Sequence, residues 1–230
     1  ERCPRGNAGR IKPAVNKLNY TRNRPRFRKS SYELQQDPAV NNGFDFTHHI
    51  RLLCKDIVHR LESLNHIDMS RVAVSFSQAR SGTRAGMYAT LTPLRFPGGR
   101  IHTVRRGRKW GMQKVKDHNG EEMLYILNFY LPRFLDLPFR EKLDTVVHEL
   151  WHIGPKCDGD LRRFGNRCFA HGPSKKQFDR QVSLMVDQWL EQSPPESVYE
   201  FLQSNFRELD ARYGRIIGSK LPAPKMFRVD

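Results

Sequence analysis

The chain is 230 residues long, and its 38% hydrophobic content is enough for one buried domain with appendages. No apolar run approaches the roughly 18 residues of a membrane span. We therefore expect no membrane anchor. The four cysteines, Cys3, Cys54, Cys157 and Cys168, are not clustered and contain no CxxC pair, and we expect free thiols rather than a disulfide scaffold. A balance of 40 Lys and Arg against 24 Asp and Glu gives a formal net charge of +16, which favours polyanionic partners. No signal-peptide pattern is visible, and we expect a cytoplasmic protein.

Residues 1 to 43 are rich in Arg, Asn and Pro and lack apolar periodicity until Tyr32. Within them, residues 1 to 30 hold ten Lys or Arg against a single acid, Glu1. Such a composition buries too little apolar surface to fold by itself. We therefore expect a basic, flexible N-terminal arm over 1–43, followed by one folded domain over 44–213.

The folded domain is expected to open with a helix and to continue with strands. From Phe46 to Leu64, apolar residues recur at the spacing of an amphipathic helix. Strands are expected over about 71 to 128, interrupted by a loop that forms a basic insertion near 95–120.

This insertion is the second concentration of positive charge. Residues 95 to 116 hold eight Lys or Arg and no acid. Clusters of this kind bind phosphates by releasing condensed counterions. Trp110 lies within the cluster and either stacks on an exposed base or packs against the domain. The predicted nucleic-acid-binding residues are Arg105, Arg106, Arg108, Lys109, Trp110 and Lys114.

The pentad His148-Glu149-Leu150-Trp151-His152 lies in an apolar-periodic run, 139–153, which Pro138 precedes and Gly154-Pro155 ends. Histidines at i and i+4 lie one turn apart on the same helix face, so both imidazoles can bind one metal ion with the glutamate beside them. The pattern predicts one catalytic Zn²⁺, a bound water of lowered pKa, and Glu149 as the general base. The alternative is an ordinary core helix with two hydrogen-bonded histidines.

A catalytic zinc takes three protein ligands, and two residues after the pentad are candidates for the third. Asp158 follows His152 by six residues, the spacing of metzincins, but Pro155 stands where those enzymes have glycine. His171 stands before a helical pattern that begins near Ser174, and imidazole is the more usual zinc donor. We predict His171, with Asp158 as the alternative.

Three acids near the pentad are candidates to accept a hydrogen bond from the second ring nitrogen of a metal-bound histidine. They are Asp144, Asp158 and Asp160. For each of them a solvated surface acid is the competing interpretation.

The C-terminal third is expected to contain a helix at about 174–192 and another at about 196–213, separated by Pro194-Pro195. The tail over 214–230 is basic and contains proline. We expect it to be loosely held.

The pentad helix, the irregular loop after it and the His171-Gly172-Pro173 segment resemble the SprT-like metalloproteases, the group that includes the Spartan DNA–protein crosslink proteases. The resemblance covers about residues 70 to 180. It implies a first strand at 72–77, a second at 84–90 and an edge strand at 124–128. It also implies zinc on His148, His152 and His171, Glu149 as general base, and DNA as an activator. The zinc ribbon that often follows this core is missing, and the basic insertion is longer than a simple strand connection.

Together these observations predict an α+β fold with a zincin-like metalloprotease core, in which a small mixed sheet packs against an active-site helix and further helices. The predicted function is that of a zinc endopeptidase that acts on proteins at or near nucleic acid, with DNA or another polyanion as partner. One alternative is a zinc peptidase whose basic surface binds an acidic partner without DNA dependence. Another is a nucleic-acid-binding module with a structural or degenerate zinc site.

Overall fold

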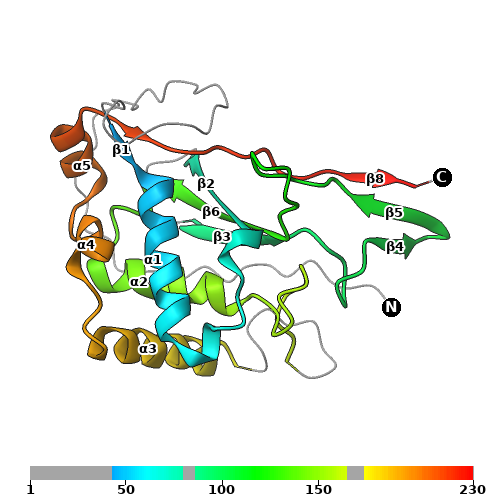
Figure 1. Ribbon diagram of the computed structural model, residues 1–230, viewed down its shortest axis with the longest axis horizontal. Coiled ribbons are helices and arrows are strands. Elements are labelled where there is room, and N and C mark those ends of the chain that lie inside the picture. The colour runs from blue at the N-terminus through cyan, green and yellow to red at the C-terminus, as the bar shows by residue number, and fades with distance from the viewer. Residues whose placement is uncertain (1–42, 80–85, 165–173, 230) are drawn as a thin grey trace.

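The structure is a computed structural model that describes residues 43–79, 86–164 and 174–229. The expected N-terminal arm, apart from Gly43, lies outside the described residues, and so does His171. Within them, five α-helices and three small sheets form an α+β fold (Figure 1). None of these helices is long and apolar enough to cross a membrane.

The main sheet contains β2 (Val72–Gln78), β6 (Tyr125–Leu131) and β3 (Ala89–Pro93), in that order. β2 runs parallel to β6, and β3 runs antiparallel to it. The strand expected at the edge, 124–128, is therefore the central strand. Its apolar run agrees with that position, because side chains on both faces of β6 are buried. The second strand of this sheet in chain order is β3, which overlaps the expected range 84–90 at Ala89 and Thr90, so a second strand is present but its predicted bounds were too early.

Helix α1 (Phe46–Arg60) covers one face of the main sheet. Asp45 caps it by accepting a hydrogen bond from the backbone N–H three residues on, at 2.9 Å. Phe46 packs against Phe76 of β2 and Phe129 of β6, with ring centroids 6.1 and 5.6 Å away. A 3₁₀ turn at Glu62–Leu64 completes the segment that was expected to be helical.

Helix α2 (Phe139–Trp151) carries the pentad and lies against β3 and α1. Helix α3 (Lys175–Glu191) packs on α2 (Figure 1). The Ser174 side chain caps α3 by accepting from the Gln177 backbone N–H at 3.3 Å. The prediction of a helix at about 174–192 is therefore confirmed.

The helix expected at 196–213 is instead three short pieces. They are α4 (Glu196–Tyr199), a 3₁₀ turn at Glu200–Gln203 and α5 (Phe206–Tyr213). The chain is extended at Ser204, with ψ of 148°, and Asn205 restarts the helix through a capping box with Glu208. This local signal outweighs the apolar periodicity that suggested one continuous helix.

The tail after Gly214 is held by strand pairing, contrary to expectation. Strand β7 (Ile216–Ile217) pairs in parallel with β1 (Phe44–Asp45). The Phe76 backbone N–H then donates to the Ser219 carbonyl at 3.1 Å, so the tail follows the edge of β2 opposite to β6. Backbone groups at that edge need partners, and the tail supplies them.

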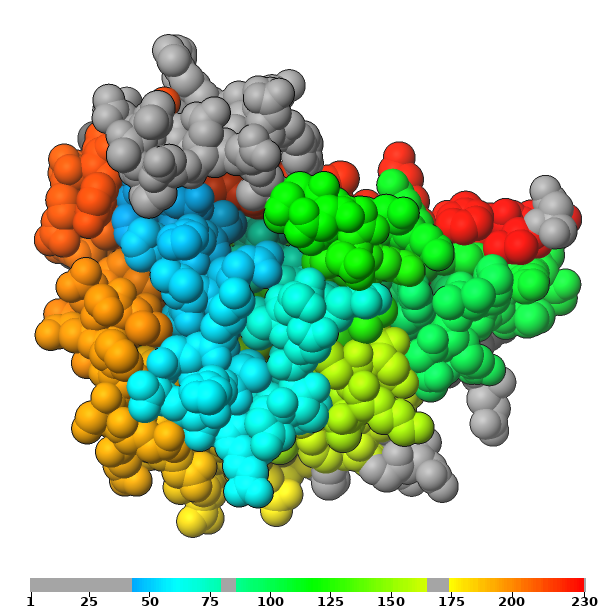
Figure 2. Space-filling view, in the orientation of Figure 1, coloured from blue at the N-terminus to red at the C-terminus, as the bar shows by residue number. Residues whose placement is uncertain are grey.

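The basic insertion is a β-arm rather than a loop. The insertion supplies β4 (His102–Arg105) and β5 (Arg108–Met112), and β8 (Met226–Arg228) of the C-terminal tail adds to β5 as a third antiparallel strand. The turn between β4 and β5 places Arg106 and Gly107 at positive φ, 52° and 69°, as a two-residue hairpin turn requires. Figures 1 and 2 show the arm extending sideways from the helices and the main sheet.

Candidate metal centre

The two pentad histidines lie together at the C-terminal end of α2. His148 is in the last turn, and His152 is the C-cap residue. Their ring centroids are 4.8 Å apart and their planes make an angle of 82°. His152 is 9% exposed, whereas the His148 side chain is 24% exposed. The helix therefore presents two imidazoles side by side, one buried and one half-buried.

Glu149 is hydrogen-bonded to β3, an edge strand of the main sheet. Its carboxylate accepts a hydrogen bond from the Leu91 backbone N–H of β3. The strand register explains this contact. The backbone N–H of Leu94, the residue after β3, donates to the carbonyl of Leu124, the residue before β6, and successive N–H groups of a strand point to opposite edges. The N–H of Leu91, three residues before Leu94, therefore points away from β6. Burial raises the pKa of Glu149 to about 7, although the Leu91 hydrogen bond opposes the shift.

Helix α3 brings two further side chains to the histidine pair. The Phe178 ring contacts both imidazoles, with centroids 4.8 Å from His148 and 5.1 Å from His152. The next residue, Asp179, has its Oδ1 4.0 Å from Nδ1 of His148. Sequence reasoning missed Asp179, because only the packing of α3 on α2 brings it to the site. It is the carboxylate of α3 nearest to a pentad histidine among the contacts the structure gives.

The loop after α2, residues 153–162, folds back toward the end of the helix, and we call this segment the return. Ile153 forms an antiparallel bridge with Leu161, and the Arg162 N–H donates to the His152 carbonyl at 2.7 Å. A side chain at Gly154 would place its Cβ 2.8 Å from the Asp160 carbonyl, so this close approach requires glycine. The return fixes the backbone of His152.

Arg162 closes this return over the last residue of α2. Its guanidinium lies 3.7 Å from the centre of the Trp151 ring, and its Nε donates to the Trp151 carbonyl at 2.8 Å. Burial lowers the pKa of Arg162. Arg162 of the charged stretch after the pentad, a residue to which the sequence analysis gave no role, thus anchors the end of α2.

The described residues contain no group of three His, Cys, Asp or Glu side chains that could hold a metal ion. His171 lies outside them, in 165–173. Both described ends of that gap contact Phe178, the residue that touches both imidazoles. The ring centroid of Phe164 lies 6.1 Å from that of Phe178, and the Ser174 carbonyl accepts from the Phe178 backbone N–H at 3.1 Å. His171 as third ligand stays a prediction.

The three acids proposed as supports for the histidines have other partners. Asp144 accepts from Arg140 Nε at 3.1 Å. Asp158 accepts the Asp160 N–H at 3.2 Å, and its carboxylate lies against Gly99 of the segment that leads into the β-arm. Asp160 accepts from Arg163 at 2.8 Å. We therefore place Asp179, rather than any of these three, beside the site.

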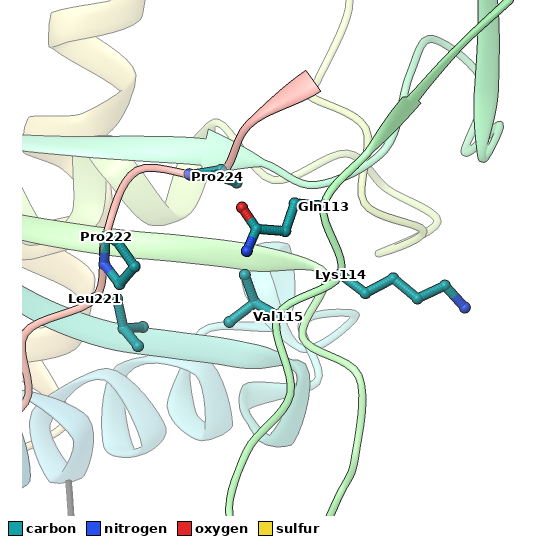
Figure 3. A pocket seen from close by; sticks show the side chains of 6 residues that line it. All are labelled: Gln113, Lys114, Val115, Leu221, Pro222 and Pro224. Carbon is teal, nitrogen blue, oxygen red and sulfur yellow. The ribbon is translucent and has the colours of Figure 1, made fainter. Parts of the chain in front are cut away.

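Of the predicted nucleic-acid residues, five lie together on the β-arm. They are Arg105, Arg106, Arg108, Lys109 and Trp110. Lys114 lies at the base of the arm, where its Nζ is 3.5 Å from the Glu122 carboxylate. A pocket at this base contains none of the pentad residues (Figure 3). It is lined by Gln113, Lys114, Val115, Leu221, Pro222 and Pro224.

No protein-family model, curated protein or solved structure matches this chain. The likeness to SprT-like metalloproteases thus rests on the pentad helix and the His171-Gly172-Pro173 segment. Any functional conclusion depends on the chemistry of the site itself.

Proposed function

We propose that the protein is a zinc-dependent endopeptidase that acts on proteins at or near DNA, with DNA as an activator. The observation that carries this proposal is Glu149. A half-buried carboxylate stands beside two imidazoles one helix turn apart, and a backbone N–H from the edge strand fixes its position. A structural zinc site needs no such general base.

The donor set fits zinc as far as the described residues reach. His148 and His152 supply two nitrogen ligands, and His171, four residues before the start of α3, is the proposed third. A zinc ion bound there would lower the pKa of its water and polarise the scissile carbonyl. Asp179, near Nδ1 of His148, is suited to orient that ring by accepting its second N–H.

Glu149 stands where a general base is needed, half-buried and next to the first of the two imidazoles in the helix. A carboxylate at this position can take a proton from a nucleophilic water and return it to a leaving amine. Its hydrogen bond to Leu91 holds one carboxylate oxygen.

The test measures zinc and proteolysis on the same protein samples. Elemental analysis is made on wild type, His171→Ala and Asp158→Ala, and casein cleavage is assayed with and without DNA. We expect one zinc per chain, lost in His171→Ala and kept in Asp158→Ala, and a rate that DNA increases. Zinc and activity that depend on Asp158 would overturn the ligand set.

DNA dependence separates the proposal from a peptidase that uses its basic surface for an acidic partner. If saturating DNA changes neither casein cleavage nor self-cleavage, the DNA-activated form of the proposal fails while the peptidase remains. If zinc binds but no variant or condition gives cleavage, the nucleic-acid module with a structural site is favoured instead.

A further inference from the structure

The β-arm has two chemically different faces, and the strand register assigns each residue to one of them. Side chains of directly paired residues point to the same side of a sheet, and successive residues alternate. The register pairs Thr103 and Arg228 with Trp110, and Arg105 with Arg108. These five residues form what we call the Trp110 face.

The opposite face is mainly apolar. Val104 pairs with Lys109, and Phe227 pairs with Gly111. The Phe227 ring lies directly over Gly111, where an added Cβ would be 2.8 Å from it. Val104 and Phe227 are 70% and 51% exposed. His102, which pairs with Gly111 from the other side, belongs to this face too. Lys109 is the one Lys or Arg on it, so positive charge is concentrated on the Trp110 face. The register thus removes Lys109, which the sequence pattern placed among the nucleic-acid-binding residues, from the contact surface considered below.

The arrangement of charge on the Trp110 face does not stabilise the arm. Arg105 and Arg108 are exposed and directly opposite each other, and like charges in that position repel. Residues 101–116 and 225–229 contain no acid in the sequence. Two cations held close together in an exposed hairpin are suited to an anionic partner with closely spaced charges.

Trp110 distinguishes among such partners. It is half-buried in the centre strand, between Thr103 and Arg228. An indole flanked by guanidinium groups can stack on the flat face of a nucleobase while the guanidiniums bind phosphates. The bases of a duplex are already stacked on one another, so their faces are not accessible to Trp110. A single strand presents both phosphates and base faces.

We propose that the Trp110 face binds single-stranded DNA, with a base on Trp110 and phosphates on Arg105 and Arg108. This inference rests on the proposed function for the choice of DNA. The same arm is connected to the metal centre. The Gly98 N–H, in the segment that leads into β4, donates to Asp160 at 2.7 Å, and Asp160 belongs to the return that fixes His152.

The test uses the full chain and a fluorescent oligothymidine strand of about 20 nucleotides, read by anisotropy across salt concentrations. Arg108→Ala and Lys109→Ala form a matched pair, because the residues are adjacent and exposed but lie on opposite faces. In Arg108→Ala, the slope of log affinity against log salt should fall by about 0.7. In Lys109→Ala, it should stay at the wild-type value.

Trp110→Ala should weaken single-strand binding by about 5- to 100-fold, and Trp110→Phe, which keeps an aromatic ring, should bind nearly as wild type. Trp110→Phe should also lose tryptophan quenching by DNA, because Trp189 is fully buried and Trp151 lies under Arg162. Equal losses in Arg108→Ala and Lys109→Ala, or no loss in Trp110→Ala, would overturn the proposal. Tighter binding of duplex DNA, RNA or poly-glutamate would also overturn it.

Binding and peptidase activity are read separately, so the two proposals can fail separately. If Glu149→Gln cleaves casein as wild type does but the Trp110 effects hold, the peptidase proposal fails and the single-strand site stands. If Glu149→Gln is inactive and Trp110→Ala binds DNA normally, the opposite holds.

Discussion

The Leu91 backbone N–H donates a hydrogen bond to the Glu149 carboxylate, and this contact joins the edge strand of the main sheet to the candidate metal helix. A general base that must face a substrate is thereby held by the backbone rather than by a mobile side chain. Backbone groups at alternate positions of β3 point away from β6, toward the same side as Glu149. Helix and strand therefore define one site.

Glu149→Gln should lower the rate of casein cleavage by at least about 10²- to 10⁴-fold, because the amide cannot take a proton. The amide oxygen can still accept from Leu91, so melting temperature and zinc content should not fall. Glu141→Gln, an exposed acid two turns earlier on α2, is the matched control and should keep wild-type activity. Loss of zinc in Glu149→Gln would contradict a purely chemical role for Glu149.

Asp179→Asn should weaken zinc binding by about 10-fold or more, because metal-bound histidines depend on an acceptor for their second ring nitrogen. The distance of 4.0 Å between Asp179 Oδ1 and His148 Nδ1 makes this acid the candidate acceptor. Zinc affinity is measured by competition with a chelator. Asp187→Asn, two turns further along α3, removes an acid that pairs with Arg140, and should leave zinc affinity unchanged. Equal effects in both variants would show a general charge effect.

Local signals in the sequence were enough to predict α2, α3 and the relative placement of His148, Glu149 and His152. A helix fixes the positions of residues four apart, and Pro138, Gly154 and Ser174 mark helix ends through local chemistry. The third ligand could not be fixed in this way. His171 and Asp158 lie in irregular segments, where spacing in sequence does not determine position in space.

Pairings between distant segments were the part that the sequence could not predict. β8 pairs with β5 across more than a hundred residues, and no feature of the short segment at 226–228 indicates that partner. The central position of β6 depends likewise on its parallel pairing with β2. By contrast, the break at Ser204 had a readable signal, the capping box of Asn205 and Glu208, which apolar periodicity outweighed in the prediction.

Asp160→Ala should destabilise the protein by about 2 kcal/mol, since it leaves a part-buried backbone N–H of the return loop without its acceptor. Asp160 accepts from the backbone N–H groups of Gly98 and Leu161 at 2.7 and 2.9 Å and from Arg163. Urea unfolding measures the loss. Asp158→Ala, two residues away, removes the acceptor of the Asp160 backbone N–H, a longer hydrogen bond of 3.2 Å, and should cost less than about 1 kcal/mol.

The same pair of variants carries a pH test. Burial alone would raise the pKa of Asp160, but hydrogen bonds from Arg163, Gly98 and Leu161 bring it below the usual carboxyl value. A depressed folded pKa contributes stability above the unfolded pKa, and this contribution disappears as the pH falls through the folded value. The difference in unfolding free energy between wild type and Asp160→Ala should therefore shrink below about pH 4. A difference that stays constant there would contradict the ionised role of Asp160.

Because of Lys142, the unfolding free energy of the protein should increase as the pH rises above neutral. The side chain is 2% exposed, and its Nζ donates to the carbonyls of Leu202 and Ser204 at 2.8 Å each. Burial lowers its pKa from 10.5 to about 8, although Asp136 and Glu208 oppose the shift. Between these two values the unfolded chain binds more protons than the folded one, so unfolding free energy rises by up to about 1.4 kcal/mol per pH unit, to a total of about 3 kcal/mol. Lys142→Met lacks this titration, and urea unfolding at about pH 7 and about pH 10 should show the wild type gaining stability relative to it.

Lys175→Met, on the exposed surface of α3, is the control and should follow the wild type at both pH values. Parallel behaviour of wild type and Lys142→Met would mean that Lys142 stays charged in the folded protein, with the two carbonyls compensating fully for its burial.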